Sequence, residues 1–503
     1  MKSSFKYLSI AVASLLPLYG CESWLDESPR SAIVISNFYK NADHAEAAVS
    51  AIYAFNRGMY LGTGTYGETP FAMLEMSTGH FVTKIGQAQF AIESGNLDVK
   101  PESPYVLSWW QNAFQGIEAA NLALDNIPPI AMDETRKKQL LGEAQFFRAY
   151  YYFNLVRLYG DVPMKIKSTA SPNDGQLGKS TVAEIYNTVI IPDLIAAEAA
   201  GLPNTSASGR VTLGTVKSML AKVYLTMAGY PLNETAKYAL ARDKAKEVID
   251  ANWYSLFQSD AAGTYFDKVN NPASDYGSEY IFMAALAPGI VNAYVPRYLL
   301  PLEANLTSDI EFGGLYPTQS LLDTYAEDDL RAQDHGYYYQ SFKVGATDYT
   351  FPWAIYKHFD KSLTVSGATS GSGKDFPIMR YPELLLIYAE AQNEADGAPN
   401  EAAYNAINSI RARAGVDDLA GLSRSAFTEA VWKERVWELS SENVVWFDMI
   451  RTQKAFVTTS STFVDLTAYT LPSSGVTFKE RNMLFPIPSR EVQASSLEQN
   501  AGY

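Results

Sequence analysis

The sequence predicts a mostly α-helical protein, built as a tetratricopeptide-like scaffold of helix pairs with an irregular, loop-rich lobe that carries a few short strands. Two observations support this fold class. Apolar residues recur at helical spacing over two long blocks, and the helices that they predict are joined by short loops. Between the blocks, over about 256–377, the periodicity fails, and Gly, Pro, Asn and Ser alternate with short aromatic runs such as Gly336-Tyr337-Tyr338-Tyr339.

The clearest predicted helix follows Asp133 and ends before Gly160-Asp161-Val162-Pro163. Its apolar stripe consists of Leu140, Ala144, Phe147, Tyr151, Leu155 and Leu158. Asp is a good N-cap, and glycine followed by proline is a typical helix end. Similar patterns predict helices over about 41–58, 105–127, 181–200, 212–229 and 234–251.

The second block predicts helices near 382–396, 400–414 and 425–451. Pro382 suits a first helical turn and Gly397 suits a helix exit. No linker with a sharp change of composition divides the chain, so we expect one domain over 21–503. We expect its scaffold over about 41–255 and 378–455, and its irregular lobe over about 256–377 together with the C-terminal segment 456–503.

The N-terminus predicts export. Lys2 and Lys6 precede an apolar run over 7–18, which has the length of a signal peptide and is too short to span a bilayer. The run ends at Cys21, the only cysteine of the chain, and resembles a bacterial lipoprotein signal in which that cysteine is lipidated. We therefore expect a signal peptide over 1–20 and a lipid anchor at Cys21; an ordinary signal peptide beside an incidental cysteine is the alternative.

Composition excludes several classes of protein. The formal charge of −15 becomes −17 when residues 1–20 are removed, which argues against nucleic acid as a partner. A single cysteine excludes disulfides within the chain and cysteine-rich zinc sites. The chain is rich in Tyr (33 residues), whose rings combine an apolar face with a polar group, and this favours a protein that binds ligands through exposed rings.

Glycine patterns and histidines do not predict a cofactor or a metal. Gly62-Thr63-Gly64-Thr65-Tyr66-Gly67 matches a dinucleotide-binding pattern but follows a helix, not a strand. Gly371-Ser372-Gly373-Lys374 lacks the first glycine and the hydroxyl of a phosphate loop. The four histidines, His44, His80, His335 and His358, show no metal-ligand spacing.

A possible catalytic pair is Glu438 and Glu442. Four residues apart on a predicted helix, the two carboxylates would face the same side, and a glycosidase could use them as acid and base. The competing interpretation is ion pairing with Arg435 and Arg451 and capping of helix ends.

Several stretches, in order along the chain, resemble the SusD-like (SusD/RagB) family of Bacteroidetes nutrient-binding outer-membrane lipoproteins. They are CESWLDESP from Cys21, EAQFFRAYYYFNLVRLYGDVPM from Glu143, MRYPELLLIYAEAQNE from Met379, INSIRARAG from Ile407, KERVWELSSENVVWFDMIR from Lys433 and LFPIPSREVQASSLEQNAGY from Leu484. Asn443 and Val445 depart from the family pattern, which has Gly and Arg at these positions.

The resemblance implies four tetratricopeptide-like helix pairs with an irregular lobe mounted on them. It also implies a lipid-anchored protein at the cell surface that captures oligosaccharide as the lid of a TonB-dependent outer-membrane transporter, with no catalytic residue and no cofactor. Capture of peptides by the same architecture, a surface glycosidase and a pure protein scaffold remain alternatives.

Sugar rings stack on flat apolar faces, and side-chain polar groups then fix their hydroxyls. We expect such contacts in loops near 60–109 and 290–355. The candidate ligand-binding residues are Tyr66, His80, Trp109, Tyr294, Arg297, Tyr338 and Trp353.

Overall fold

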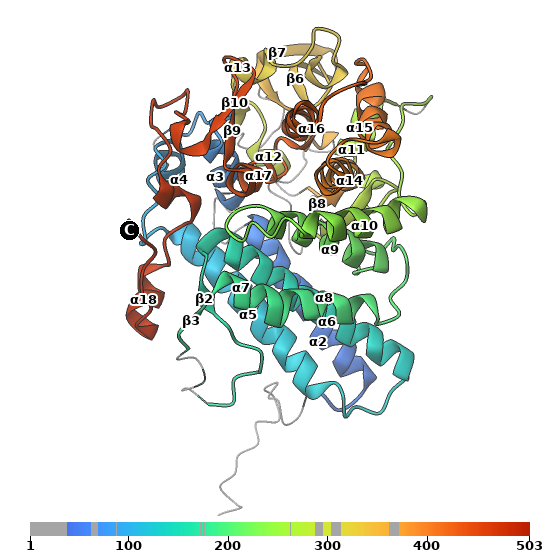
Figure 1. Ribbon diagram of the computed structural model, residues 1–503, viewed down its shortest axis with the longest axis vertical. Coiled ribbons are helices and arrows are strands. Elements are labelled where there is room, and N and C mark those ends of the chain that lie inside the picture. The colour runs from blue at the N-terminus through green and yellow to red at the C-terminus, as the bar shows by residue number, and fades with distance from the viewer. Residues whose placement is uncertain are drawn as a thin grey trace, which may run out of the picture.

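The computed structural model describes residues 38–61, 69–86, 88–171, 174, 177–261, 263–286, 295–302, 313–361 and 372–503. Helices dominate it, and the strands are short (Figure 1). The predicted signal peptide, Cys21 and the glycine pattern at 62–67 lie outside the described residues.

The first block forms a stack of helices. They are α2 (Ala42–Leu61), α5 (Pro104–Asn126), α6 (Glu134–Tyr159), α7 (Val182–Ile185), α8 (Ile191–Glu198), α9 (Leu213–Ala228) and α10 (Lys237–Asp250). Contacts run from α2 to α5 and α6, then through α8, α9 and α10 to α14 (Tyr381–Asp396). Figure 1 shows this array rising from the lower half of the molecule. The helix-pair scaffold that the sequence predicts is confirmed.

Helix α6 is the centre of the scaffold. Asp133 caps it by accepting a hydrogen bond from Arg136 N, and the chain leaves it at Gly160, whose φ is 74°. Sixteen of its residues are buried, so its C-terminal half packs on all sides and not along one stripe. Helix α5 comes so close that a Cβ on Gly116 would lie 2.3 Å from the Tyr151 ring, and only glycine permits this approach.

The predicted helix over 425–451 is wrong as one element. Helix α16 (Arg424–Leu439) ends early and α17 (Val445–Thr452) begins after a turn. In the turn, Ser441 and Asn443 adopt φ values of 64° and 58°, which no helix accommodates. Tertiary contacts hold the turn, because Asn443 N donates to Glu75 Oε1. The left-handed conformation also explains why Asn can stand where the family has Gly.

The predicted helix over 181–200 is divided as well, because a π-helical segment (Tyr186–Ile190) separates α7 from α8. Around α14 the second block continues with α15 (Glu401–Ala414), α16 and α17, and α14 contacts both α15 and α16. Two further helices near the N-terminal block, α3 (Thr69–Ser77) and α4 (Gln89–Gly95), were not predicted from the sequence.

The irregular lobe carries short helices and two-stranded sheets at the top of Figure 1. Its helices are α11 (Tyr265–Asn270), α12 (Val295–Tyr298) and α13 (Gln319–Leu322). Its strands are β4 (Tyr280–Ala284), β5 (Tyr316–Pro317), β6 (Tyr338–Val344) and β7 (Thr347–Ile355). Strand β4 pairs with β8 (Phe376–Arg380), and β5 pairs with β1 (Phe81–Val82). These pairings connect the lobe to segments that are distant in the sequence.

The remaining elements are β2 (Val162–Pro163), β3 (Lys179–Ser180), β9 (Lys454–Val457), β10 (Thr462–Asp465) and α18 (Ser489–Ser495). The sequence predicts that the segment 456–503 belongs to the lobe, but the last residues of this segment contact the scaffold. Phe485 N donates to Leu158 O, and Asn500 Nδ2 donates to Tyr159 O, both at the end of α6. The C-terminal segment therefore hydrogen-bonds to the last carbonyl groups of α6, the central helix.

Candidate functional site

The sequence-predicted binding residues fall into three groups. Tyr66 and Tyr294 lie outside the described residues. Arg297, on α12, and Trp353, on β7, are half-buried, and the Trp353 ring packs against the main core. Both side chains are partly exposed, and their role in ligand binding stays a prediction.

His80, Trp109 and Tyr338 lie in the interior, where a ligand does not reach their rings. The Trp109 ring stacks on Phe485 and its Nε1 donates to Met59 O at 2.7 Å. Tyr338 is 2% exposed, and His80 is fully buried beside Phe456 O. We therefore correct these three assignments, because their rings stabilise the core.

A pocket in the irregular lobe is the candidate site. We call it the hairpin pocket, because the β6–β7 hairpin forms one wall; it encloses about 740 Å³. Its lining residues are Ser259, Thr264, Phe266, Asp267, Leu330, Gln333, Asp334, His335, Gly336, Ser341, Phe342, Lys343, Asp348, Tyr349, Thr350, Tyr356 and Lys361.

Aromatic rings form the apolar part of the hairpin pocket. Phe342 and Tyr349 are paired across the hairpin, so both side chains project from the same face, and both are half-buried. The His335 ring lies 5.2 Å from Tyr356 and 6.1 Å from Phe342, measured between ring centroids. A second, smaller core that includes Tyr356 supports these rings from beneath.

Carboxylates form the polar part. Asp334 accepts hydrogen bonds from Gln340 N at 2.8 Å and Ser341 Oγ at 2.6 Å. Asp267 is bound by Lys361 Nζ at 3.1 Å. Partial burial raises the pKa of Asp267, but hydrogen bonds from Thr264 and Lys361 outweigh it, so the pKa lies below its usual value. The pocket thus places carboxylate acceptors beside flat rings.

The sequence offered a signal for these rings that periodicity alone did not reveal. Gly345 takes a φ of 61° in the turn between β6 and β7, and the residues on either side pair across the hairpin. A hairpin centred there would have aligned Phe342 with Tyr349. The tyrosine run just before it, around Tyr338, is the stronger aromatic signal in the sequence, but its rings are buried.

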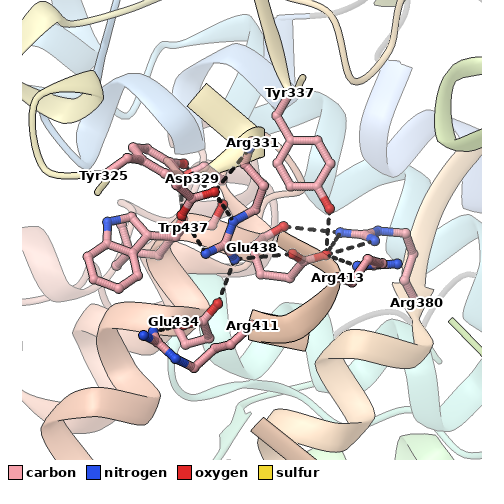
Figure 2. Close-up of polar contacts among 12 residues, drawn as sticks. Tyr325, Asp329, Arg331, Tyr337, Arg380, Arg411, Arg413, Glu434, Trp437 and Glu438 are labelled. Carbon is pink, nitrogen blue, oxygen red and sulfur yellow. Dashed lines mark hydrogen bonds and ion pairs between the residues drawn. The ribbon is translucent and has the colours of Figure 1, made fainter. Parts of the chain in front are cut away.

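Glu438 and Glu442 are not a catalytic pair. Glu442 lies beyond the end of α16, and both side chains are buried. Glu438 Oε1 accepts hydrogen bonds from three groups (Figure 2): Arg380 Nη1 at 3.1 Å, Arg413 Nη2 at 2.8 Å and Tyr337 OH at 2.6 Å. Arg380 also binds Glu442, with Nε 3.0 Å from Oε2.

These residues belong to a buried ion-pair network that joins the lobe to the scaffold. Its cations are Arg331, Arg380, Arg411, Arg413 and Lys357, and its carboxylates are Glu279, Asp329, Glu434, Glu438 and Glu442. Burial would raise the pKa of Glu438, but the surrounding arginines outweigh it and lower the pKa to about 2. A general acid needs a raised pKa, so this carboxylate does not donate protons at neutral pH.

The partners that we expected for the pair, Arg435 and Arg451, bind elsewhere. Arg435 Nε and Arg451 Nε each lie 2.7 Å from Asp448, and Arg451 also binds Glu390. Ion pairing as the role of Glu438 and Glu442 is confirmed, with different arginines.

The described residues contain no group of His, Cys, Asp and Glu side chains that could hold a metal ion. His80 and His358 are buried, and burial lowers the pKa of each to about 4. His358 Nε2 donates to Ser441 O at 2.6 Å, so this ring holds the turn after α16. Both histidines are therefore structural.

These histidines predict acid sensitivity. Each stays neutral in the folded state but is protonated below about pH 6.5 in the unfolded chain. Their contribution is complete above pH 6.5 and is lost as the pH falls toward 4. Glu75 has the opposite effect on the pH dependence of stability. Burial raises its pKa to about 7, and its protonated form stabilises the fold at lower pH.

We expect His358→Gln to flatten the pH dependence of the unfolding free energy between pH 4.5 and 6.5, by about 1.4 kcal/mol per pH unit. Glu75→Gln should steepen it by a similar amount. Urea unfolding midpoints measured across this range test both changes. Parallel curves for the parent and both variants would contradict the assignment.

The fold and the hairpin pocket define a helical-repeat scaffold protein. Its pocket suits a ligand that has both an apolar face and polar groups. Comparison with known proteins gives the family. The profile of the SusD family matches residues 332–503, and the profile described as "Starch-binding associating with outer membrane" matches residues 23–225. A crystal structure of a SusD superfamily protein from Parabacteroides distasonis is 33% identical, with a TM-score of 0.85 over 92% of this chain and 99% of that chain. The chain belongs to the SusD family.

More distant relatives are found by sequence and by structure. SusD-like protein P25 of Formosa agariphila is 24% identical, covering 88% of this chain and 89% of its own. Surface glycan-binding protein A of Bacteroides thetaiotaomicron, solved in complex with laminarihexaose, is 18% identical, with a TM-score of 0.72 over 92% of this chain and all of that chain. Among the described residues, no helix is both long and apolar enough to cross a bilayer.

Proposed function

We propose that this protein captures an oligosaccharide at the outer membrane surface, as a lipoprotein anchored through Cys21, and delivers it to a TonB-dependent transporter without chemical change. The observation that carries the proposal is the hairpin pocket, in which the Phe342 and Tyr349 rings lie beside carboxylate acceptors. Family membership supports it, since the surface glycan-binding protein A was solved with laminarihexaose.

The chemistry of the pocket favours a neutral glycan. A pyranose ring presents a patch of C–H groups that stacks on an aromatic face, and its hydroxyls donate to carboxylates. Three aspartates and two lysines line the pocket, and the chain without its first twenty residues carries a net charge of −17. A strongly anionic glycan would be repelled by this balance of charge.

We expect Tyr349→Ala to weaken glycan binding by about tenfold, because a stacked ring contributes about 0.5–1.5 kcal/mol beyond the area that it buries. A screen of neutral glycans and peptides identifies the responding ligand, and calorimetry measures its affinity. The parent should bind with a dissociation constant between about 1 μM and 1 mM, or −8 to −4 kcal/mol. Affinity should change little with salt, because the ligand is uncharged.

Phe463→Ala is the matched control, because Phe463 is a half-buried ring in the separate β9–β10 hairpin. Trp353→Ala reports whether the ligand extends along β7. Equal binding by the parent and Tyr349→Ala, with both folded, would place the site elsewhere. Binding of peptides alone would contradict glycan capture, and release of new reducing ends from a bound glycan would contradict a non-catalytic role.

The transporter is the proposed partner. Family resemblance motivates this choice of partner. The docking surface that we propose lies on the helices of the scaffold, away from the hairpin pocket. Two proteins confined to one membrane meet at a high effective concentration, so a stable complex is favoured. We expect affinity purification after gentle detergent extraction to recover a large outer-membrane barrel with this protein. Recovery of this protein alone, even after cross-linking, would contradict the proposal.

A further inference from the structure

Arg157, in the last turn of α6, has an unusual environment. Its guanidinium lies between two aromatic rings, with its central carbon 3.9 Å from the centroid of Phe153 and 3.8 Å from that of Phe447. Ring contacts this short help to hold the guanidinium in place and leave its N–H groups for polar partners, an arrangement that suits planar anions.

The charge of Arg157 has no carboxylate partner among the described residues. Its Nη2 donates to Asn154 Oδ1 at 2.7 Å and its Nε donates to Phe153 O at 3.2 Å, and both acceptors are uncharged. Other arginines of the scaffold differ, since Arg148 binds Asp193 through two hydrogen bonds. Burial lowers the pKa of Arg157, and the nearby tyrosines and the more distant Glu383, which binds Lys222, offset this only in part.

Arg157 lines a pocket of about 250 Å³ between the ends of α6 and α9 and helix α17, which we call the Arg157 pocket. Its walls are largely apolar and include Val182, Tyr186, Leu232 and Ile450. Asp161 is the one carboxylate among the lining residues, and it accepts a hydrogen bond from Val182 N. The pocket thus combines an apolar wall with two cations, Arg157 and Lys179, that make no ion pair within the part of the chain that the structure describes.

We propose that the Arg157 pocket binds a carboxylate joined to a single aromatic or branched aliphatic group. The carboxylate would accept hydrogen bonds from the free edge of the guanidinium, and the apolar group would lie against the wall. Such a ligand comes either from a free small acid or from the C-terminal residue of a chain. This site lies on the scaffold and is separate from the hairpin pocket, so it stands whether or not that pocket binds glycan.

The test compares 3-phenylpropionate with its neutral amide by calorimetry on the purified protein. We expect the acid to bind at least about tenfold more tightly than the amide, because hydrogen bonds between charged groups are the stronger ones. Arg157→Met should remove this preference, whereas Lys167→Met should keep it. Lys167 is the control, since it is not among the residues that line the pocket and its Nζ binds Asp125 at the surface.

The peptide Ala-Ala-Phe, with a free or an amidated C-terminus, distinguishes the two sources. Tighter binding of the free peptide than of 3-phenylpropionate identifies a chain terminus, and the reverse identifies a small acid; both outcomes support the proposal. Equal binding of acid and amide by the parent protein overturns it, as does no binding of either acid. The comparison in the parent decides the question even if Arg157→Met fails to fold.

Discussion

Arg380→Met is expected to destabilise the protein by about 3–5 kcal/mol, or to prevent its accumulation. Arg380 is completely buried and binds Glu279, Glu438 and Glu442 at once. Methionine fills part of the space but leaves these carboxylates without a shared cation. An uncompensated charge in the interior costs far more than the original pair contributes, which is why the loss is large.

Thermal melting and urea unfolding measure the effect. Tyr337→Phe is a milder variant of the same network, because it removes only the hydroxyl that donates to Glu438; it should cost about 1–3 kcal/mol. Lys100→Met is the surface control: the side chains of Lys100 and Asp98 are 54% and 40% exposed, so the loss should stay below about 1 kcal/mol. An Arg380→Met protein as stable as the parent would show that the network does not hold the lobe.

The network also explains which parts of the fold could be predicted. The helices of the scaffold follow from local signals, such as the Asp133 cap, the apolar stripe behind it and the exit at Gly160. The turn at 440–444 does not, because its sequence continues the helical pattern. The turn forms because Glu442 and Asn443 bind residues that are distant in the sequence, Lys357 and Glu75.

The candidate site was harder to predict for the same reason. The aromatic-rich sequence indicated where the lobe lies. Whether a given ring is exposed to solvent depends on which neighbouring side chains cover it. Tyr338 is buried beneath Tyr325, whereas Phe342, four residues later on the same strand, lines the hairpin pocket. A register shift between Tyr339 and Ser341 separates the two environments, and such an irregularity has no local sequence signal.

Cys21→Ala is expected to move the protein from the membrane fraction to the soluble fraction. The lone cysteine after the apolar run resembles a lipidation site, and each buried acyl CH₂ contributes about 0.8 kcal/mol. One chain gives only reversible binding, but several chains make the anchor effectively permanent. Removing the thiol removes the predicted lipidation site, so the loss from the membrane fraction should be nearly complete once the signal peptide is cut.

Fractionation of cells followed by an alkaline carbonate wash measures this change, because the wash strips protein held only by other proteins. Alanine at position 21 can also leave the signal uncleaved, and the apolar run over 7–18 would then retain the chain. A second variant therefore combines Cys21→Ala with a secretory signal that is cut by the ordinary peptidase, and mass spectrometry of the N-terminus confirms the cut. If this second protein stays in the washed membranes, anchoring does not depend on Cys21 and the protein holds to the bilayer in another way.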